Sequence, residues 1–313
     1  MRRHRTRSAS SAAPGAAEIN RRTAVRLSRF VTLVGDKMLS RTATDTNADG
    51  PLGLIRLASA GPGAAAALAV SATSIVAEGT DLGSAGQAGT WAYPLTGNRQ
   101  PTFLGASSGF VLEVDSSEVW LVDGSTIREV SVRSGTGTGR SYVVDGRLVA
   151  AAGAGLVLQR GDQVVWWLPG LPGQSEVIGT GEAVTASFEY ILWRTTSGLL
   201  TITDPNTLGM LGHPLRVPLS QPVVAAALDP YLDFRVAVAT GDSVAIGDTF
   251  SNHAVTVHLR QVNGLAWLDH DTLLARVGAQ GVTVIDASSG TVVHEPHLPF
   301  DAQGLGVVET PSP

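Results

Sequence analysis

The most regular feature of the chain is a pair of short apolar and β-branched runs separated by a tight polar turn. A run of this kind, bounded by Gly, Asp, Asn or Ser, predicts a β-strand, and two runs joined by a short turn predict a hairpin. Five stretches follow the pattern: 110–132, 155–170, 190–208, 235–257 and 272–293. The pattern therefore predicts an all-β body built from antiparallel hairpins.

These hairpins recur at a regular interval. The second run of each ends at a turn-forming position, and these positions are 45, 36, 44 and 38 residues apart: Asp123, Leu168, Asp204, Asp248 and Asp286. Asp suits such a turn because its carboxylate accepts hydrogen bonds from backbone N–H groups that follow it. A period of about 40 residues with four short strands per unit is typical of a β-propeller blade. Stacking around an axis buries both faces of sheets that could not bury them alone.

The pattern predicts about six four-stranded blades over residues 73–313. The five stretches supply five of them, and residues 73–100 supply a shorter sixth. The tail at 304–310 is expected to add a strand that closes the ring. Seven blades is the alternative if residues 47–70 contribute strands.

Two of the blade turns resemble a known class of propeller. "TITDPNTLGML" (201–211) and "VIDASSGTVV" (284–293) are similar to blades of bacterial WD-repeat-like and quinoprotein-like propellers, in which Asp precedes Gly by a few residues. The resemblance covers roughly residues 73–300 and implies the architecture, but no single activity, because propellers carry many functions. The WD dipeptide is absent from the five blades. Thr291 and Val293 replace the Lys and Trp of the quinoprotein signature, which argues against a quinone site.

Residues 1–50 form a basic leader in this interpretation. Residues 1–17 are expected to be disordered, and residues 18–39 to form an amphipathic helix that contacts an anionic membrane or docks on the chain's own acidic body. A start codon assigned too far upstream is the remaining alternative. The apolar stripe of this helix would be Leu27, Phe30, Val31, Val34 and Met38, opposite Arg22, Arg26 and Arg29.

Residues 51–72 form a weak apolar segment with two interpretations. Its Ala-rich stretch ends in Val70-Ser71-Ala72, which resembles the cleavage site of an export signal. The alternative is an ordinary edge strand with its loop. The first interpretation places the protein outside the cytoplasm, whereas retention of the basic helix places it on a membrane; a cytoplasmic location also stays open.

Composition excludes several kinds of chemistry. The chain has no Cys, which excludes disulfides, thiolate metal sites and cysteine nucleophiles. Its net charge is −5, although residues 1–30 hold eight Arg and one acidic residue, so the body is acidic. An acidic body argues against nucleic acid as a partner, because phosphate contacts need cations.

Three motifs have the residue types of known functional sites but lack the flanking helix or the final ligand that those sites need. Gly105–Gly109 has the spacing of a hydrolase elbow around Ser107, and 135–140 resembles a phosphate loop, yet a strand follows each where a helix is needed. The segment 45–50 opens like a calcium loop, but Arg56 occupies the position of the bidentate Glu. We therefore expect ordinary turns at all three.

The spacing of the histidines does not predict a metal site, and the spacing of the tryptophans does not predict a ligand-stacking surface. The histidines near the C-terminal end lack ligand spacing and are expected to be scattered in loops: His253, His258, His270, His294 and His297. The six Trp are expected to pack between blades rather than to form an exposed stacking surface. Adjacent Trp166 and Trp167 must face opposite sides of their strand.

The sequence thus predicts no catalytic, cofactor-binding or metal-binding residue and no cofactor. The leading hypothesis is a non-catalytic, extracytoplasmic binding propeller that engages a protein, peptide or glycan at one rim. One alternative is a propeller-type enzyme, such as a quinoprotein-like dehydrogenase, a lactonase or a lyase. Another is a cytoplasmic scaffold held on an anionic membrane by residues 18–39. Acids and histidines converging at the mouth of the channel would favour the enzyme.

Overall fold

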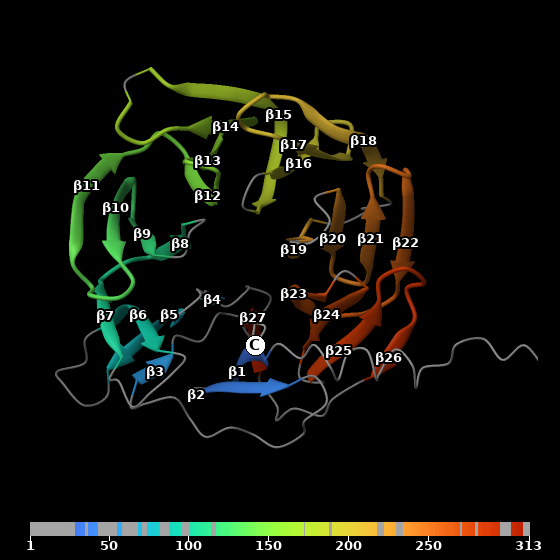
Figure 1. The fold of residues 1–313 in the computed structure, drawn as a ribbon, viewed down its shortest axis with the longest axis horizontal. Coiled ribbons are helices and arrows are strands. Elements are labelled where there is room, and N and C mark those ends of the chain that lie inside the picture. Colours follow the sequence, from blue (N-terminus) through green and yellow to red (C-terminus); the bar gives the residue numbers. More distant parts are fainter. Residues whose placement is uncertain are drawn as a thin grey trace, which may run out of the picture.

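The computed structural model describes most of the chain beyond the basic leader. The described residues are 29–34, 37–42, 55–57, 68–70, 74–81, 88–94, 101–113, 117–171, 173–187, 190–217, 222–229, 234–269, 271–278, 281–294 and 302–308. All regular elements in these ranges are strands. No helix in them is long and apolar enough to cross a membrane. Figure 1 shows the sheets arranged around a common axis.

Three sheets have four antiparallel strands that follow one another along the chain, the first nearest the axis and the last outermost (Figure 1). The first of these sheets contains β8 (Gly109–Leu112), β9 (Glu118–Asp123), β10 (Thr126–Ser131) and β11 (Gly137–Val143). The second contains β19 (Ala225–Leu228), β20 (Arg235–Ala239), β21 (Val244–Asp248) and β22 (His253–Val257). The third contains β23 (Val262–Asp269), β24 (Thr272–Val277), β25 (Gly281–Asp286) and β26 (Val292–His294).

A seven-stranded sheet follows β11 along the chain, and it consists of two halves that share one strand. The shared strand is β15 (Ser175–Ala186), whose first half pairs with β14 and whose second half pairs with β16. The remaining strands are β12 (Arg147–Ala152), β13 (Gly155–Arg160), β14 (Gln163–Trp167), β16 (Ile191–Thr195), β17 (Leu199–Thr203) and β18 (Met210–Arg216).

The N-terminal strands form two further sheets. One contains β3 (Ile55–Leu57), β4 (Leu68–Val70), β5 (Ser74–Asp81), β6 (Ala88–Pro94) and β7 (Thr102–Gly105), with β3 and β4 both paired to β5. The other contains β1 (Arg29–Val34) between β2 (Lys37–Thr42) and the C-terminal β27 (Ala302–Val308). Strands thus occur at 55–57 and 68–70, which is the condition attached to the seven-blade alternative.

The helix expected at 18–39 is not seen. Residues 18–28 lie outside the described part, and 29–34 and 37–42 form an antiparallel pair instead. The stretch "RFVTLV" matches a helical stripe, but three of its six residues are β-branched (Val31, Thr32 and Val34), and such residues favour a strand. Pairing with β27 on the other side supplies the remaining backbone hydrogen bonds, so tertiary contacts override the helical periodicity.

The turn positions used to measure the repeat are not all equivalent. Asp123 ends a second strand, β9, and a two-residue turn joins it to Thr126 of β10. Leu168, Asp204, Asp248 and Asp286 instead end or directly follow third strands. The ends of the third strands lie 36, 36, 45 and 38 residues apart, at Ser131, Trp167, Thr203, Asp248 and Asp286. The Asp-Gly turn at 123–124 joins the second and third strands, but it uses the same residue types as the turns that follow third strands. The first interval in the sequence was therefore measured from a position one strand too early.

The predicted role of Asp at the third-strand turns is confirmed at three positions. Oδ1 of Asp204 accepts a hydrogen bond from the backbone N–H of Asn206 at 2.8 Å. Oδ1 of Asp248 accepts from Phe250 at 2.8 Å, and Oδ1 of Asp286 from Ser289 at 2.8 Å. These Asx turns end the third strand and direct the chain into the fourth.

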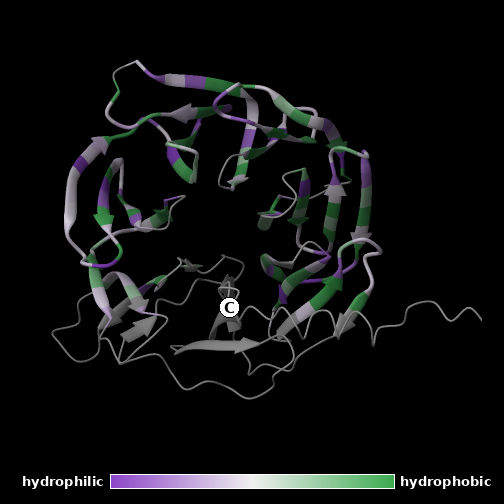
Figure 2. Ribbon diagram, in the orientation of Figure 1, coloured by the Kyte–Doolittle hydropathy of each residue, from purple (hydrophilic) through white to green (hydrophobic). Residues whose placement is uncertain are grey.

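The apolar core lies between neighbouring sheets. Figure 2 shows hydrophobic residues recurring along the strands of the coloured sheets. Successive residues of β9 divide between two clusters: Val119 and Leu121 pack toward the β5–β7 side, whereas Trp120 packs with Leu156 and Leu158 of β13. This period of two is what a strand buried on both faces produces.

A candidate binding pocket between two sheets

A polar row crosses the β8–β11 sheet on the face turned toward β13. Glu129 of β10 pairs with Trp120 of β9, and Trp120 pairs with Val111 of β8. Glu113 follows two positions after Val111, which places it on the same side because alternate residues share a face. Trp120 Nε1 donates a hydrogen bond to Glu113 Oε1 at 2.6 Å. The pleat of three strands therefore brings two carboxyl groups and an indole together.

Arg140 of the outer strand β11 completes this row. Its Nη1 donates to Glu129 Oε1, and Thr138 Oγ1 donates to the other oxygen, Glu129 Oε2. Glu129 is only 3% exposed, and a buried charged group needs a counter-charge and hydrogen bonds of the kind that Arg140 and Thr138 supply. Arg140 also lies over the Trp120 ring, with Cζ 5.1 Å from the ring centroid.

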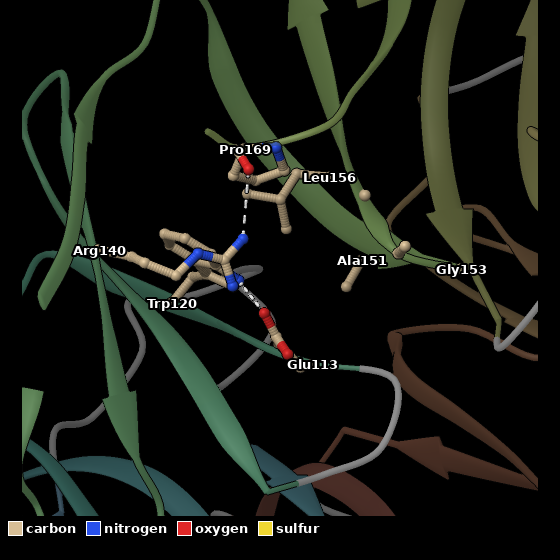
Figure 3. Close-up of a pocket in the computed structure, with 9 residues that line it drawn as sticks. Glu113, Trp120, Arg140, Ala151, Gly153, Leu156 and Pro169 are labelled. Carbon is tan, nitrogen blue, oxygen red and sulfur yellow. Dashed lines mark hydrogen bonds between the residues drawn. The ribbon is translucent and has the colours of Figure 1, made fainter. Parts of the chain in front are cut away.

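The same guanidinium reaches the next sheet. Arg140 Nη2 donates to the carbonyl oxygen of Pro169 at 3.4 Å, across the boundary between the two sheets (Figure 3). Tyr142, two residues along β11, meets Trp167 of β14 edge to face, with ring centroids 5.3 Å apart. Arg140 and Tyr142 therefore link the β8–β11 sheet to the β12–β15 half-sheet.

A pocket of about 320 Å³ lies between these two sheets. The first sheet lines it with Glu113, Trp120 and Arg140; the second lines it with Ala151, the Gly153–Leu156 segment and Pro169 (Figure 3). The connections that carry Glu113, Gly153 and Pro169 follow the first or third strand of their sheets. Antiparallel order places such connections at the same end of the common axis, so the pocket lies at one rim of the sheets.

Small residues leave room on the far side of the pocket. Ala152 pairs with Gly155, so Gly153 and Ala154 form a two-residue hairpin turn, with Gly153 at φ +55°. A Cβ added to Gly155 would lie 2.5 Å from Trp166 Nε1, which explains why glycine occupies that position. The residues that line the pocket opposite Glu113 thus offer methyl groups and backbone, and no charge.

The pocket raises the pKa of Glu113 to about 7. Burial is the largest cause, followed by a hydrogen bond with the carboxyl group of Glu129 and by the negative charge of Glu129. The hydrogen bond from Trp120 and the charge of Arg140 oppose the shift. Glu113 therefore gains and loses its proton near neutral pH.

Of the three motifs set aside in the sequence, one is a short connection between strands, one is mostly part of a strand and one lies outside the described residues. Ser107 lies between β7 and β8, with no helix after it, and its hydroxyl is 2.5 Å from Thr90 Oγ1. In the 135–140 segment, strand β11 already begins at Gly137, so the loop is shorter than expected and its last residue, Arg140, belongs to the pocket. The segment 45–50 lies outside the described residues.

The histidines form no cluster within the described part of the chain. His253 begins β22 and His294 ends β26, whereas His270 and His297 lie outside that part. No group of three His, Asp or Glu residues that could hold a metal ion occurs among the described residues.

The packing role expected of the tryptophans is confirmed for most of them. Five are less than a tenth exposed: Trp91, Trp120, Trp166, Trp193 and Trp267. Trp166 and Trp167 do face opposite sides of β14, since they pack into different clusters.

Sequence reasoning did not identify Glu113, Glu129 or Arg140 as a group. One signal was present: in "TIREVS" the alternation of β10 assigns Glu129 to the same face as Ile127, which is buried. A charged residue at an inward position is informative because carboxylates are rarely buried without a partner. The partner, Arg140, lies on another strand, and spacing in the sequence does not reveal it.

Solved structures share this arrangement at low sequence identity. A chain of the mitotic checkpoint complex matches with a TM-score of 0.59 and 14% identity, over 83% of this chain and 87% of that chain. Apo AztD from Citrobacter koseri matches with a TM-score of 0.54 and 14% identity, over 90% and 98% of the two chains. No protein-family model and no curated protein sequence matches the chain. The comparisons support an all-β, β-propeller-like architecture, as the repeat predicts, and no specific family.

Proposed function

We propose that the chain is a non-catalytic binding protein of the propeller type, with the pocket between the β8–β11 and β12–β15 strands as its ligand site. The observation that carries the proposal is a cavity of about 320 Å³ at one rim, into which a partly buried carboxyl group and an arginine converge. Sites of this kind combine apolar walls with a few placed polar groups. Its volume is at the lower end for ligand pockets, so it suits a small molecule or one protruding group of a protein, peptide or glycan.

The proposal includes a seven-bladed ring. Counting each half of the seven-stranded sheet as one blade gives one blade each for β12–β15 and β15–β18. The pairing of β27 with β1 would close the ring by joining the two ends of the chain in one blade. Sharing of β15 supports this count, because a blade's outer strand ordinarily leads to the inner strand of the next blade.

The site is tested by filling it from the exposed hairpin turn. Ala154→Trp places a large ring at the pocket without changing a buried residue. Asp162→Trp is the matched control, because Asp162 is exposed in the β13–β14 turn at the opposite rim. A panel of simple amines, carboxylates, alcohols and monosaccharides is screened by ligand-observed NMR. We expect at least one class to bind the wild type and Asp162→Trp, but not Ala154→Trp. Binding that Ala154→Trp leaves intact, or no binding by any class at millimolar concentration, would contradict the proposal.

The specific observation that favours an enzyme instead is the pKa of Glu113, about 7, which suits a general acid or base near neutral pH. A lactonase or a lyase is then the second candidate. Turnover of a lactone panel by the wild type that is abolished in Glu113→Gln, with folding intact, would replace the binding proposal. We expect no turnover.

A further inference from the structure

Resting on the proposed ligand site, we propose that the pocket recognises a monovalent organic cation, such as the ammonium group of an alkylamine or of a lysine side chain. The Glu113 carboxylate would hold this group against the wall formed by Gly153 and Ala154. The argument rests on the charges that face the cavity and on which of them are already neutralised.

Glu113 and Arg140 are the charged side chains among the described residues that line the pocket, and Glu129, which does not line it, contacts both. Arg140 is matched to Glu129: it pairs with Glu129 Oε1, lies over the Trp120 ring and donates to the carbonyl of Pro169. Glu113 is the second carboxyl group; it accepts a hydrogen bond from the neutral indole N–H of Trp120 and shares a hydrogen bond with Glu129. One arginine therefore faces two carboxyl groups, and the ionised site carries one excess negative charge.

Among the described residues, those that line the pocket from the second sheet supply no compensating charge. The lining residues from the second sheet are Ala, Gly, Leu and Pro. The phenol of Tyr142 lies beside Arg140 on β11. A neutral site thus requires either a proton on the Glu113–Glu129 pair or a cation in the cavity.

The chemistry of the cavity discriminates among ligands. A carboxylate ligand would meet the Glu113 carboxylate, and a divalent cation would face the Arg140 guanidinium at short range. An alkylammonium group carries one charge, which matches the one excess negative charge, and its N–H groups can donate to the Glu113 carboxylate. Its alkyl part would lie against Ala151 and Leu156.

A cation and a proton should therefore compete for the carboxyl group in the pocket. Because the pKa of Glu113 is about 7, this carboxyl group is mostly protonated at lower pH and must release its proton before the cation binds. The apparent affinity is expected to rise about tenfold between about pH 6 and about pH 8 and then to level off.

The experiment uses n-butylammonium as the probe, with butan-1-ol and butyrate as the neutral and anionic analogues. NMR titration of the full chain is performed at both pH values on the wild type, Glu113→Gln, Ala154→Trp and the control Glu176→Gln. Glu176 is an exposed carboxylate on β15. We expect n-butylammonium to bind the wild type and Glu176→Gln with the stated pH dependence. Glu113→Gln should weaken this binding at least about tenfold at the higher pH, where the lost carboxylate is ionised.

The outcomes separate the cation inference from the proposed site. If butan-1-ol or butyrate binds in preference to n-butylammonium and Ala154→Trp abolishes that binding, the pocket stands as a ligand site and the cation inference fails. Failure of n-butylammonium to bind, or pH-independent binding, also overturns the inference. If n-butylammonium binds the wild type and Ala154→Trp equally, both the cation inference and the assignment of the pocket fail.

Discussion

At the scale of single residues, Glu113 differs from the acidic residues of the turns. Asp204, Asp248 and Asp286 each accept backbone N–H groups at a turn, and these hydrogen bonds help to lower the pKa of Asp204 and Asp286. Glu113 is partly buried beside another carboxyl group, which disfavours its ionised form. The same functional group, a carboxyl, thus has a structural role at the turns, whereas in the pocket it adds a negative charge that no nearby cation among the described residues balances.

This difference predicts how stability depends on pH. The pKa of Glu113 is raised from 4.5 to about 7 in the folded state, so the folded chain holds this proton more tightly than the unfolded chain. Its contribution to stability is present below about pH 4.5 and is lost as the pH rises to about 7. Glu113→Gln keeps the shape of the side chain but cannot titrate, so it does not lose this contribution as the pH rises. The difference in unfolding free energy, variant minus wild type, should therefore be larger at about pH 8 than at about pH 5.

Urea unfolding at the two pH values measures this difference, with Glu176→Gln as the exposed control. Parallel pH dependence in the wild type and Glu113→Gln would show that Glu113 does not carry the shifted proton.

At the scale of elements, the shared strand β15 depends on glycine. Gly179 pairs with Val164 next to the point where β15 passes from one half-sheet to the other. A Cβ added there would lie 2.4 Å from Trp193 Cη2, inside the volume of a buried ring. Trp193 has little freedom to move, because its Nε1 donates to Thr203 Oγ1 at 3.0 Å.

Gly179→Ala is therefore expected to lower the free energy of unfolding by about 1–3 kcal/mol, the usual cost of overpacking a core. Gly109→Ala is the matched control, since nothing lies within 4 Å of a Cβ added to that strand residue. Chemical denaturation of the two variants checks the prediction. An effect of Gly179→Ala no larger than that of Gly109→Ala would mean that Trp193 relaxes freely.

Local sequence predicted the individual strands well but not every element type. Residues such as Val282–Ile285 favour a strand wherever they lie, and β25 occupies that position. Phe30, Val31 and Val34 matched both a helical stripe and a strand, and the pairing of β1 with β2 and β27 decided between them. Asp123 was assigned to the wrong turn because hairpin turns and blade turns use the same residue types.

At the scale of the whole molecule, both termini contribute to one sheet. β27 at the C-terminal end pairs with β1, and β3 and β4 pair with β5. Cleavage after Ala72, as an export signal would require, removes β1 to β4 and leaves the described edges of β5 and β27 without these partners. The intact mass of the protein in its native cells would show whether this cleavage occurs.

A chain that starts at residue 73 should accordingly be less stable than one that starts at residue 27, which keeps all four strands. We expect the shorter chain to unfold at a clearly lower temperature and to aggregate more, because unpaired strand edges are exposed. Calorimetry and light scattering compare the two chains. Equal midpoints would mean that the N-terminal strands contribute nothing to the stability of the ring.

The pattern of apolar runs and polar turns was sufficient to predict an all-β body, its period of about 40 residues and its propeller-like arrangement, because alternation and turn chemistry act over a few residues. It also predicted the buried tryptophans. Only the tertiary structure decided the strands at 29–42, the sharing of β15 and the meeting of Glu113, Glu129 and Arg140. Each of these depends on pairing or contact between segments distant in sequence, and the polarity of a single strand does not specify its partner.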